Sequence, residues 1–120
     1  MSNNGSKWCW PATRLALYHR DGFACVYCTE TERPLTLDHV VPVELGGSHA
    51  PSNVVTACVR CNSAKQAKTM RSWFAFLRAR GVDTKAIARR VRNALARRVD
   101  REEGKRLLAL RRSNTERAAA

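Results

Sequence analysis

Two pairs of cysteines constrain this chain more than any other feature. Cys25 and Cys28 form one Cys-x-x-Cys pair, and Cys58 and Cys61 form a second. This spacing lets both sulfurs of a pair reach one ion, so two pairs together predict a tetrahedral zinc site. Because four thiolates leave the ion no open position, we assign the zinc a structural role. A bound ion would also support the small core that a chain of 120 residues can build.

The distribution of apolar residues along the chain indicates the cellular compartment. The first residues, 1–7, have no signal-peptide core, and no stretch approaches the ~18 apolar residues of a membrane span. We therefore expect no membrane contact and a cytoplasmic location, in a bacterial or phage-infected cell, where thiols stay reduced. Cys9 belongs to neither pair, and we expect it to be a small spare thiol outside the metal site.

The charge of the chain is unevenly distributed. Residues 1–59 hold four Lys and Arg against five Asp and Glu, a net charge of −1, whereas residues 60–120 hold eighteen against five, a net charge of +13. Such asymmetry predicts a polyanionic partner, most often nucleic acid. The alternative is a solvated helix surface in an arginine-rich chain, since Arg outnumbers Lys seventeen to five.

Local patterns predict a few short strands between helices. We expect a helix over 11–20, a strand over 35–37, an extended segment over 40–45, a second strand over 53–57 and a helix from 62 to 81. Further on, Asp83 or Thr84 is expected to cap a helix whose apolar stripe is Ile87, Val91, Leu95 and Val99. Residues 102–104 predict a break or kink before a short last helix, and residues 115–120 are expected to fray.

Polar residues between the cysteine pairs have the chemistry of a second metal site. Asp38 and His39 are adjacent at a strand end, so their side chains point in different directions. Asn62 directly follows the last cysteine, and its amide oxygen is a hard ligand that suits Mg²⁺ or Mn²⁺. Taken singly, Asn62 could be a helix cap, Asn53 a turn residue and Asp38 a salt-bridge partner, but their order favours one site.

This order resembles that of the HNH endonucleases, the ββα-metal (His-Me finger) nucleases with a four-cysteine zinc knuckle, over residues 14–68. The resemblance implies a small α+β fold with a ββα-metal core and a four-cysteine zinc site, but it says nothing about the tail after residue 70. The local patterns add a short N-terminal helix before this core and basic C-terminal helices after it. We therefore divide the chain into a flexible leader (1–10), an HNH nuclease domain with the zinc knuckle (11–81) and a basic helical extension (82–120).

The resemblance also implies roles for single residues. His39 resembles the general base, Asp38 and Asn62 the ligands of a catalytic Mg²⁺ or Mn²⁺, and Asn53 the asparagine that pins the loop and so orients the histidine. Lys65 resembles a basic residue that meets a phosphate near the helix N-terminus. Asn62 stands where many relatives have His, which favours an all-oxygen site.

The predicted function is metal-dependent nicking of DNA, with structural Zn²⁺ beside the catalytic ion. DNA contacts are expected from Lys65 and from arginines of the tail, namely Arg89, Arg90, Arg97 and Arg98. The alternative is a non-catalytic zinc-knuckle module that binds nucleic acid, or an accessory subunit of a larger DNA-processing complex. A homodimer is a further option. His19 and His49 lie outside the motif and are interpreted as surface residues, His49 with a weak case for substrate contact, and Trp8 as a core or cap residue.

Overall fold

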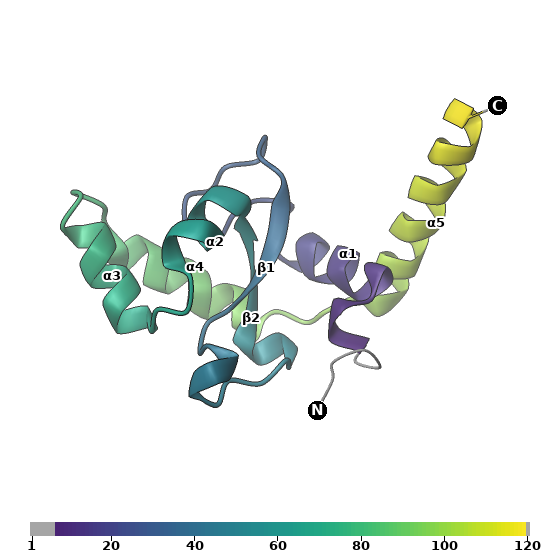
Figure 1. The fold of residues 1–120 in the computed structure, drawn as a ribbon. Coiled ribbons are helices and arrows are strands. Elements are labelled where there is room, and N and C mark those ends of the chain that lie inside the picture. Colours follow the sequence, from purple (N-terminus) through teal and green to yellow (C-terminus); the bar gives the residue numbers. More distant parts are fainter. Residues whose placement is uncertain (1–6, 120) are drawn as a thin grey trace.

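The computed structural model describes residues 7–119 and shows a small α+β fold around a two-stranded sheet (Figure 1). The elements are η1 (Lys7–Cys9), α1 (Pro11–Arg20), β1 (Leu35–His39), η2 (Val43–Leu45), η3 (Pro51–Asn53), β2 (Val54–Cys58), α2 (Val59–Lys65), α3 (Met70–Arg78), α4 (Thr84–Ala96) and α5 (Arg101–Ala119), where η marks a 3-10 helix. Most of the predicted leader lies outside the described residues. The predicted α+β class and the helix over 11–20 are confirmed.

The two strands pair antiparallel, and both faces of the sheet are covered. Asp38 lies opposite Val55, and His39 lies opposite Val54. Because side chains alternate along a strand, Val55 packs with the cysteine segment and α4, whereas Val54 packs with Leu17 of α1. A two-stranded sheet is marginal on its own, so this double cover stabilises the strand end that carries Asp38 and His39.

Helix α4 contributes to the same core as the cysteine segment. Ile87, Val91 and Ala94 are buried in one cluster with Cys25, Val26, Tyr27 and Trp73. The predicted cap is confirmed, since the Asp83 carboxylate accepts from the amide of Lys85. Leu95 packs against the first cluster, but Val99 follows the end of α4 and packs on the second. The domain boundary proposed at residue 81 stays a prediction.

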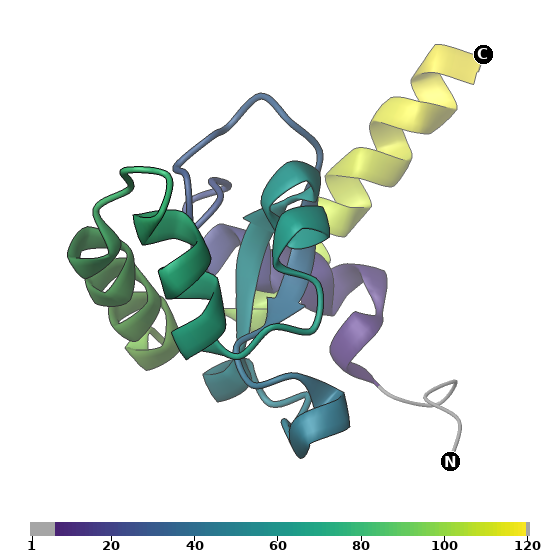
Figure 2. The ribbon, with the colours of Figure 1, turned by 60° about the vertical axis from the view of Figure 1, so that its left-hand side comes forward.

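The single helix predicted from Asn62 to Gly81 is wrong. α2 begins earlier, at Val59, because the Cys58 sulfur accepts from the Cys61 amide and caps it. It ends at Lys65, where Gln66 adopts a positive φ of 52°. The Thr69 hydroxyl then caps α3. α3 and α4 lie side by side in Figures 1 and 2.

The break predicted at residues 102–104 is also wrong, because α5 is continuous from Arg101 to Ala119. Gly104 is buried where α5 crosses α1, and a Cβ there would lie 2.3 Å from the Ala12 carbonyl oxygen. The glycine therefore permits close helix contact. The predicted fraying is not seen through Ala119, and α5 extends away from the body (Figure 2).

The segment between the strands differs from its predicted extended form. Val43–Leu45 is a 3-10 turn that follows Pro42 and ends at Gly46, whose φ is 93°. β1 includes Asp38 and His39, and Asn53 closes a second 3-10 turn just before β2. The chain after His39 therefore folds back beside the strand end.

Candidate functional site

The four predicted zinc ligands meet in space. The sulfurs of Cys25, Cys28, Cys58 and Cys61 all lie within 4.8 Å of one another, and those of Cys28 and Cys58 are 3.7 Å apart. Tetrahedral bonds of about 2.3 Å place zinc-bound sulfurs roughly 3.8 Å apart, so the cluster fits such an ion. The amides of Cys28 and Cys61 donate to the first sulfur of their own pair, at 3.5 and 3.4 Å.

The thiols of this cluster differ in acidity. A hydrogen bond from the Cys61 thiol, opposed by burial and helped by backbone amides, lowers the pKa of Cys25 to about 5. The same bond and burial raise the pKa of Cys61. Because a metal binds the thiolate, proximity of four such groups supports a site that could hold an ion such as zinc.

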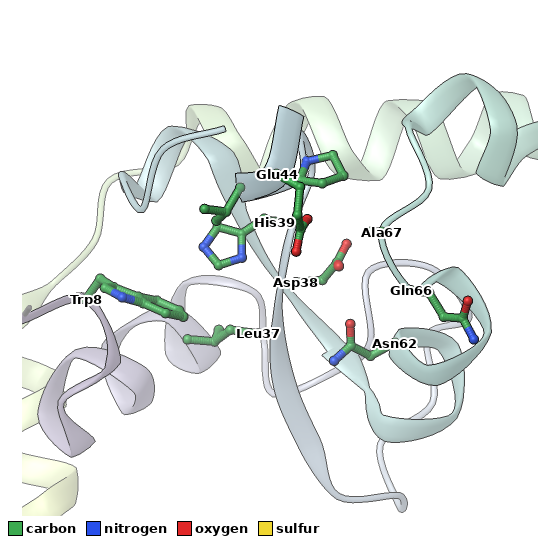
Figure 3. Close-up of a pocket in the computed structure, with 10 residues that line it drawn as sticks. Trp8, Leu37, Asp38, His39, Glu44, Asn62, Gln66 and Ala67 are labelled. Carbon is green, nitrogen blue, oxygen red and sulfur yellow. The ribbon is translucent and has the colours of Figure 1, made fainter. Parts of the chain in front are cut away.

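A second site is a cleft of about 390 Å³ at the end of β1. Asp38 and His39 of β1, Asn62 of α2, Glu44 of η2 and Trp8 of η1 line it (Figure 3). The structure thus brings the predicted ligands and the predicted base to one cleft. In Figure 3 the amide oxygen of Asn62 points toward the Asp38 carboxylate from below, and the His39 ring lies to the left of that carboxylate.

Asp38 is buried and held by two groups that the sequence did not indicate. The Tyr27 hydroxyl donates to Oδ2 at 2.5 Å, and Lys65 Nζ lies 3.1 Å from Oδ2 and 3.4 Å from Oδ1. Burial raises the pKa of Asp38, whereas the Tyr27 hydrogen bond and the Lys65 charge lower it. Because Tyr27 lies between the two cysteines of the first pair, its hydrogen bond links the cysteine segment to Asp38.

Lys65 differs from its predicted placement. It is the last residue of α2 and is fully buried, not near a helix N-terminus. Its ammonium also donates to the His39 carbonyl oxygen at 3.0 Å. Lys65 therefore has internal partners on both residues of the strand end, and its contact with a substrate phosphate stays a prediction.

His39 has an aromatic and imidazole environment. Its Nε2 lies 2.9 Å from Nδ1 of His49, and the Trp8 indole stacks on His49 with ring centroids 4.6 Å apart. Burial, and then the nearby His49, lower the pKa of His39, while Asp38 opposes the shift. The interpretation of His49 as a surface residue is therefore corrected, because it is half-buried against His39. Trp8 lines the cleft.

Asn53 fastens the loop that follows His39. Its side-chain oxygen accepts from the Val41 amide at 2.9 Å, and its amide nitrogen donates to the carbonyls of Val41 and Ser48 at 3.0 and 2.9 Å. Gly47 belongs to the same close packing, since a Cβ there would lie 1.7 Å from the Val41 oxygen. This geometry agrees with the loop-pinning role expected of Asn53.

The predicted DNA-contact arginines have two kinds of environment. Arg89, Arg97 and Arg98 are exposed on or just after α4. Arg90 is half-buried, and its guanidinium donates to the carbonyls of Val26 and Tyr27 at 2.8 and 2.9 Å. Arg90 therefore already stabilises the cysteine segment.

Two strands followed by a helix, with a four-cysteine cluster at one end, define a zinc-knuckle ββα domain. Residues 25–73 match the family model described as HNH endonuclease, so the chain carries an HNH endonuclease domain there. The match includes both cysteine pairs, both strands and α2, but it covers less than half of the chain. Searches of curated proteins and of solved structures found no match. Within residues 7–119, every helix is too short or too polar to cross a membrane.

Proposed function

We propose that this protein is a metal-dependent endonuclease that hydrolyses one DNA strand at the cleft. The observation that supports this most is the convergence of Asp38, His39 and Asn62 in one cleft within the segment that matches the HNH endonucleases. A module that only binds nucleic acid does not need an imidazole beside a carboxylate and an amide oxygen.

The donor set of the cleft suits a hard divalent ion. We assign Asp38 Oδ1 and the Asn62 amide oxygen as ligands of Mg²⁺ or Mn²⁺, both of which prefer oxygen. Oδ1 is the better donor because Oδ2 already holds Tyr27 and the shorter Lys65 contact. When bound, the ion would neutralise charge on the scissile phosphate and on the leaving 3′-oxygen.

His39 takes the role of general base. Its free ring nitrogen accepts a proton from water, and the resulting hydroxide attacks phosphorus as the bond to the 3′-oxygen breaks, after which the leaving 3′-oxygen takes a proton from solvent water. The products expected by resemblance are a 5′-phosphate and a 3′-hydroxyl. Burial lowers the pKa of His39 and so favours the neutral imidazole that a base requires, and Asn53 holds the loop that follows His39.

DNA contacts outside the cleft are assigned to Arg89, Arg97 and Arg98. These three are exposed in the half of the chain whose net charge is +13, from eighteen basic and five acidic residues. Arg90 is a weaker candidate, since carbonyls of the cysteine segment hold its guanidinium. Each phosphate contact steepens the log–log salt dependence of binding by about 0.9.

The salt dependence of DNA binding tests this interface. Replacing the three exposed arginines with alanine removes three phosphate contacts and should reduce the slope of log binding constant against log salt concentration by roughly 2.7. A matched control removes the same charge from α5, at Arg111, Arg112 and Arg117. An equal loss of slope in both triple variants would show that only net charge matters and would refute the assignment.

The alternative is a zinc-knuckle module that binds nucleic acid without cutting it, alone or within a DNA-processing complex. The closed cysteine cluster and the excess of arginine would serve that role equally well. The presence or absence of cleavage distinguishes the two functions.

Relaxation of a supercoiled plasmid tests the proposed function. Zinc-loaded protein freed of other ions should produce open circles only when Mg²⁺ or Mn²⁺ is added. Asp38→Asn and Asn62→Ala should lose nicking and weaken Mn²⁺ binding, yet retain one zinc per chain. Loss of zinc from either variant while it remains folded would contradict the assigned ligands, and no nicking by the wild type with any divalent ion would favour the binding module.

A further inference from the structure

His49 contacts the proposed base at an atom that constrains its chemistry. Nε2 of His39 lies 2.9 Å from Nδ1 of His49, a hydrogen-bond distance, so one proton lies between the two nitrogens. This leaves Nδ1 as the only ring nitrogen of His39 that can address a water in the cleft.

Either His39 or His49 can be the donor of that hydrogen bond. If His49 donates from its Nδ1, a neutral His39 carries its proton on the cleft-facing Nδ1 and cannot act as a base there. If His39 donates from Nε2, its Nδ1 carries a lone pair, and His49 is the acceptor with its own proton on Nε2. Catalysis by His39 therefore requires the second arrangement.

Two further contacts hold His49 in place. The Trp8 indole is parallel to the His49 ring within 1° and meets the His39 ring edge-on, with centroids 4.8 Å apart. The neighbouring Ser48 is held by Asn53, which donates to its carbonyl oxygen at 2.9 Å. The orientation of His49 is thus fixed by η1 on one side and by the pinned loop on the other.

We propose that His49 is a positioning residue, whose Nδ1 accepts the Nε2 proton of His39 and so keeps the His39 lone pair directed into the cleft. This inference rests on the proposed function of His39 as general base. Once His39 has taken a proton from water, its Nε2–H bond to His49 becomes charge-assisted and stronger. His49 then stabilises the imidazolium without contacting substrate.

Nitrogen NMR of the zinc-loaded protein, without a catalytic ion and without DNA, tests the tautomer pair directly. At about pH 8, both rings should give the signals of Nε2–H tautomers. A through-bond coupling should join His39 Nε2 to His49 Nδ1 in the wild type. A His39 ring protonated at Nδ1, or a folded protein without that coupling, would overturn the inference.

Variants of His49 link the tautomer to catalysis. His49→Ala should mix the two His39 tautomers and lower the nicking rate at saturating DNA by about 10- to 100-fold, with little change in DNA affinity. His49→Asp provides an acceptor without a donor and should restore the Nε2–H tautomer and most of the rate. Zinc content and melting temperature verify that each variant is folded.

The outcomes separate this inference from the function on which it rests. If the wild type does not nick DNA, the proposed function fails, while the NMR result still decides the hydrogen bond. If the wild type nicks and folded His49→Ala nicks equally fast, the positioning role is refuted. An Asp variant that is as slow as the Ala variant, with the His39 tautomer restored, would refute it as well.

Discussion

Lys65→Met gives the sharpest prediction from the structure. The substitution removes the ammonium but keeps an apolar stem of similar length. The side chains of Lys65 and Asp38 are 0% and 6% exposed, so Asp38 would be left as a buried carboxylate without its counter-charge. Breaking a buried ion pair in this way costs about 3–5 kcal/mol of folding free energy. The double variant Asp38→Asn/Lys65→Met should recover most of that loss.

The loss should depend on pH. Burial already raises the pKa of Asp38, and removal of Lys65, which lowers it, should raise the pKa further. When folding raises the pKa of a carboxyl group, the folded protein loses stability as pH rises from the unfolded-state pKa to the folded-state pKa. The penalty of Lys65→Met should therefore be complete above that pKa and should diminish as pH falls toward the unfolded value of about 3.9.

Urea unfolding of zinc-loaded protein, measured at about pH 8 and at a series of lower pH values, tests both effects. Lys105→Met is the matched control, because Lys105 pairs with Glu102 on the exposed face of α5 and should change stability little. A loss below about 1 kcal/mol at pH 8 for Lys65→Met would place the pair among weak surface bridges and refute the argument. A double variant as unstable as the single one would refute it too.

Three further predictions concern the cysteine cluster, the contact between α1 and α5 at Gly104, and the proposed base His39. Cys61→Ser should lose zinc and cooperative unfolding together, as metal analysis and thermal melts would show, and a well-folded variant without zinc would contradict the structural role. Gly104→Ala should lower the free energy of unfolding by about 1–3 kcal/mol, because its Cβ would meet the Ala12 oxygen at 2.3 Å. The control Ala109→Ser, on the exposed face of α5, should change it little. Equal losses in the two variants would refute the close contact between α5 and α1. Because the pKa of His39 is lowered, its neutral form persists to lower pH. The nicking rate, plotted against pH, should therefore rise with a midpoint below the ordinary histidine pKa of about 6.5. A midpoint above that value would contradict burial as the cause.

The parts of the site that sequence reasoning predicted are the local ones. The cysteine spacing and the position of Asn62 next to Cys61 fix these groups within a few residues, and Asp38 and His39 share a strand end. The partners of Asp38 could not be predicted in this way. Tyr27 reads as a core aromatic and Lys65 as a surface cation, since lysine is rarely buried unless it is paired.

The errors in the predicted fold also have tertiary causes. α2 ends before Gln66, a residue whose type gives no warning of a positive φ. Gly104 predicts a break because glycine is a poor helix former. In the structure, contact with α1 outweighs that propensity. The sequence likewise places His49 on the surface, because its contact with His39 spans a loop.

The single-turnover nicking rate of His39→Ala, at saturating plasmid with Mg²⁺ or Mn²⁺ present, tests most directly whether this cleft is the active site. His19→Ala is the matched control, because His19 is exposed on α1. His39→Ala should bind plasmid and retain zinc but should not nick the plasmid, while His19→Ala should nick like the wild type. Nicking by folded His39→Ala at the wild-type rate would contradict the assignment of this cleft as the active site.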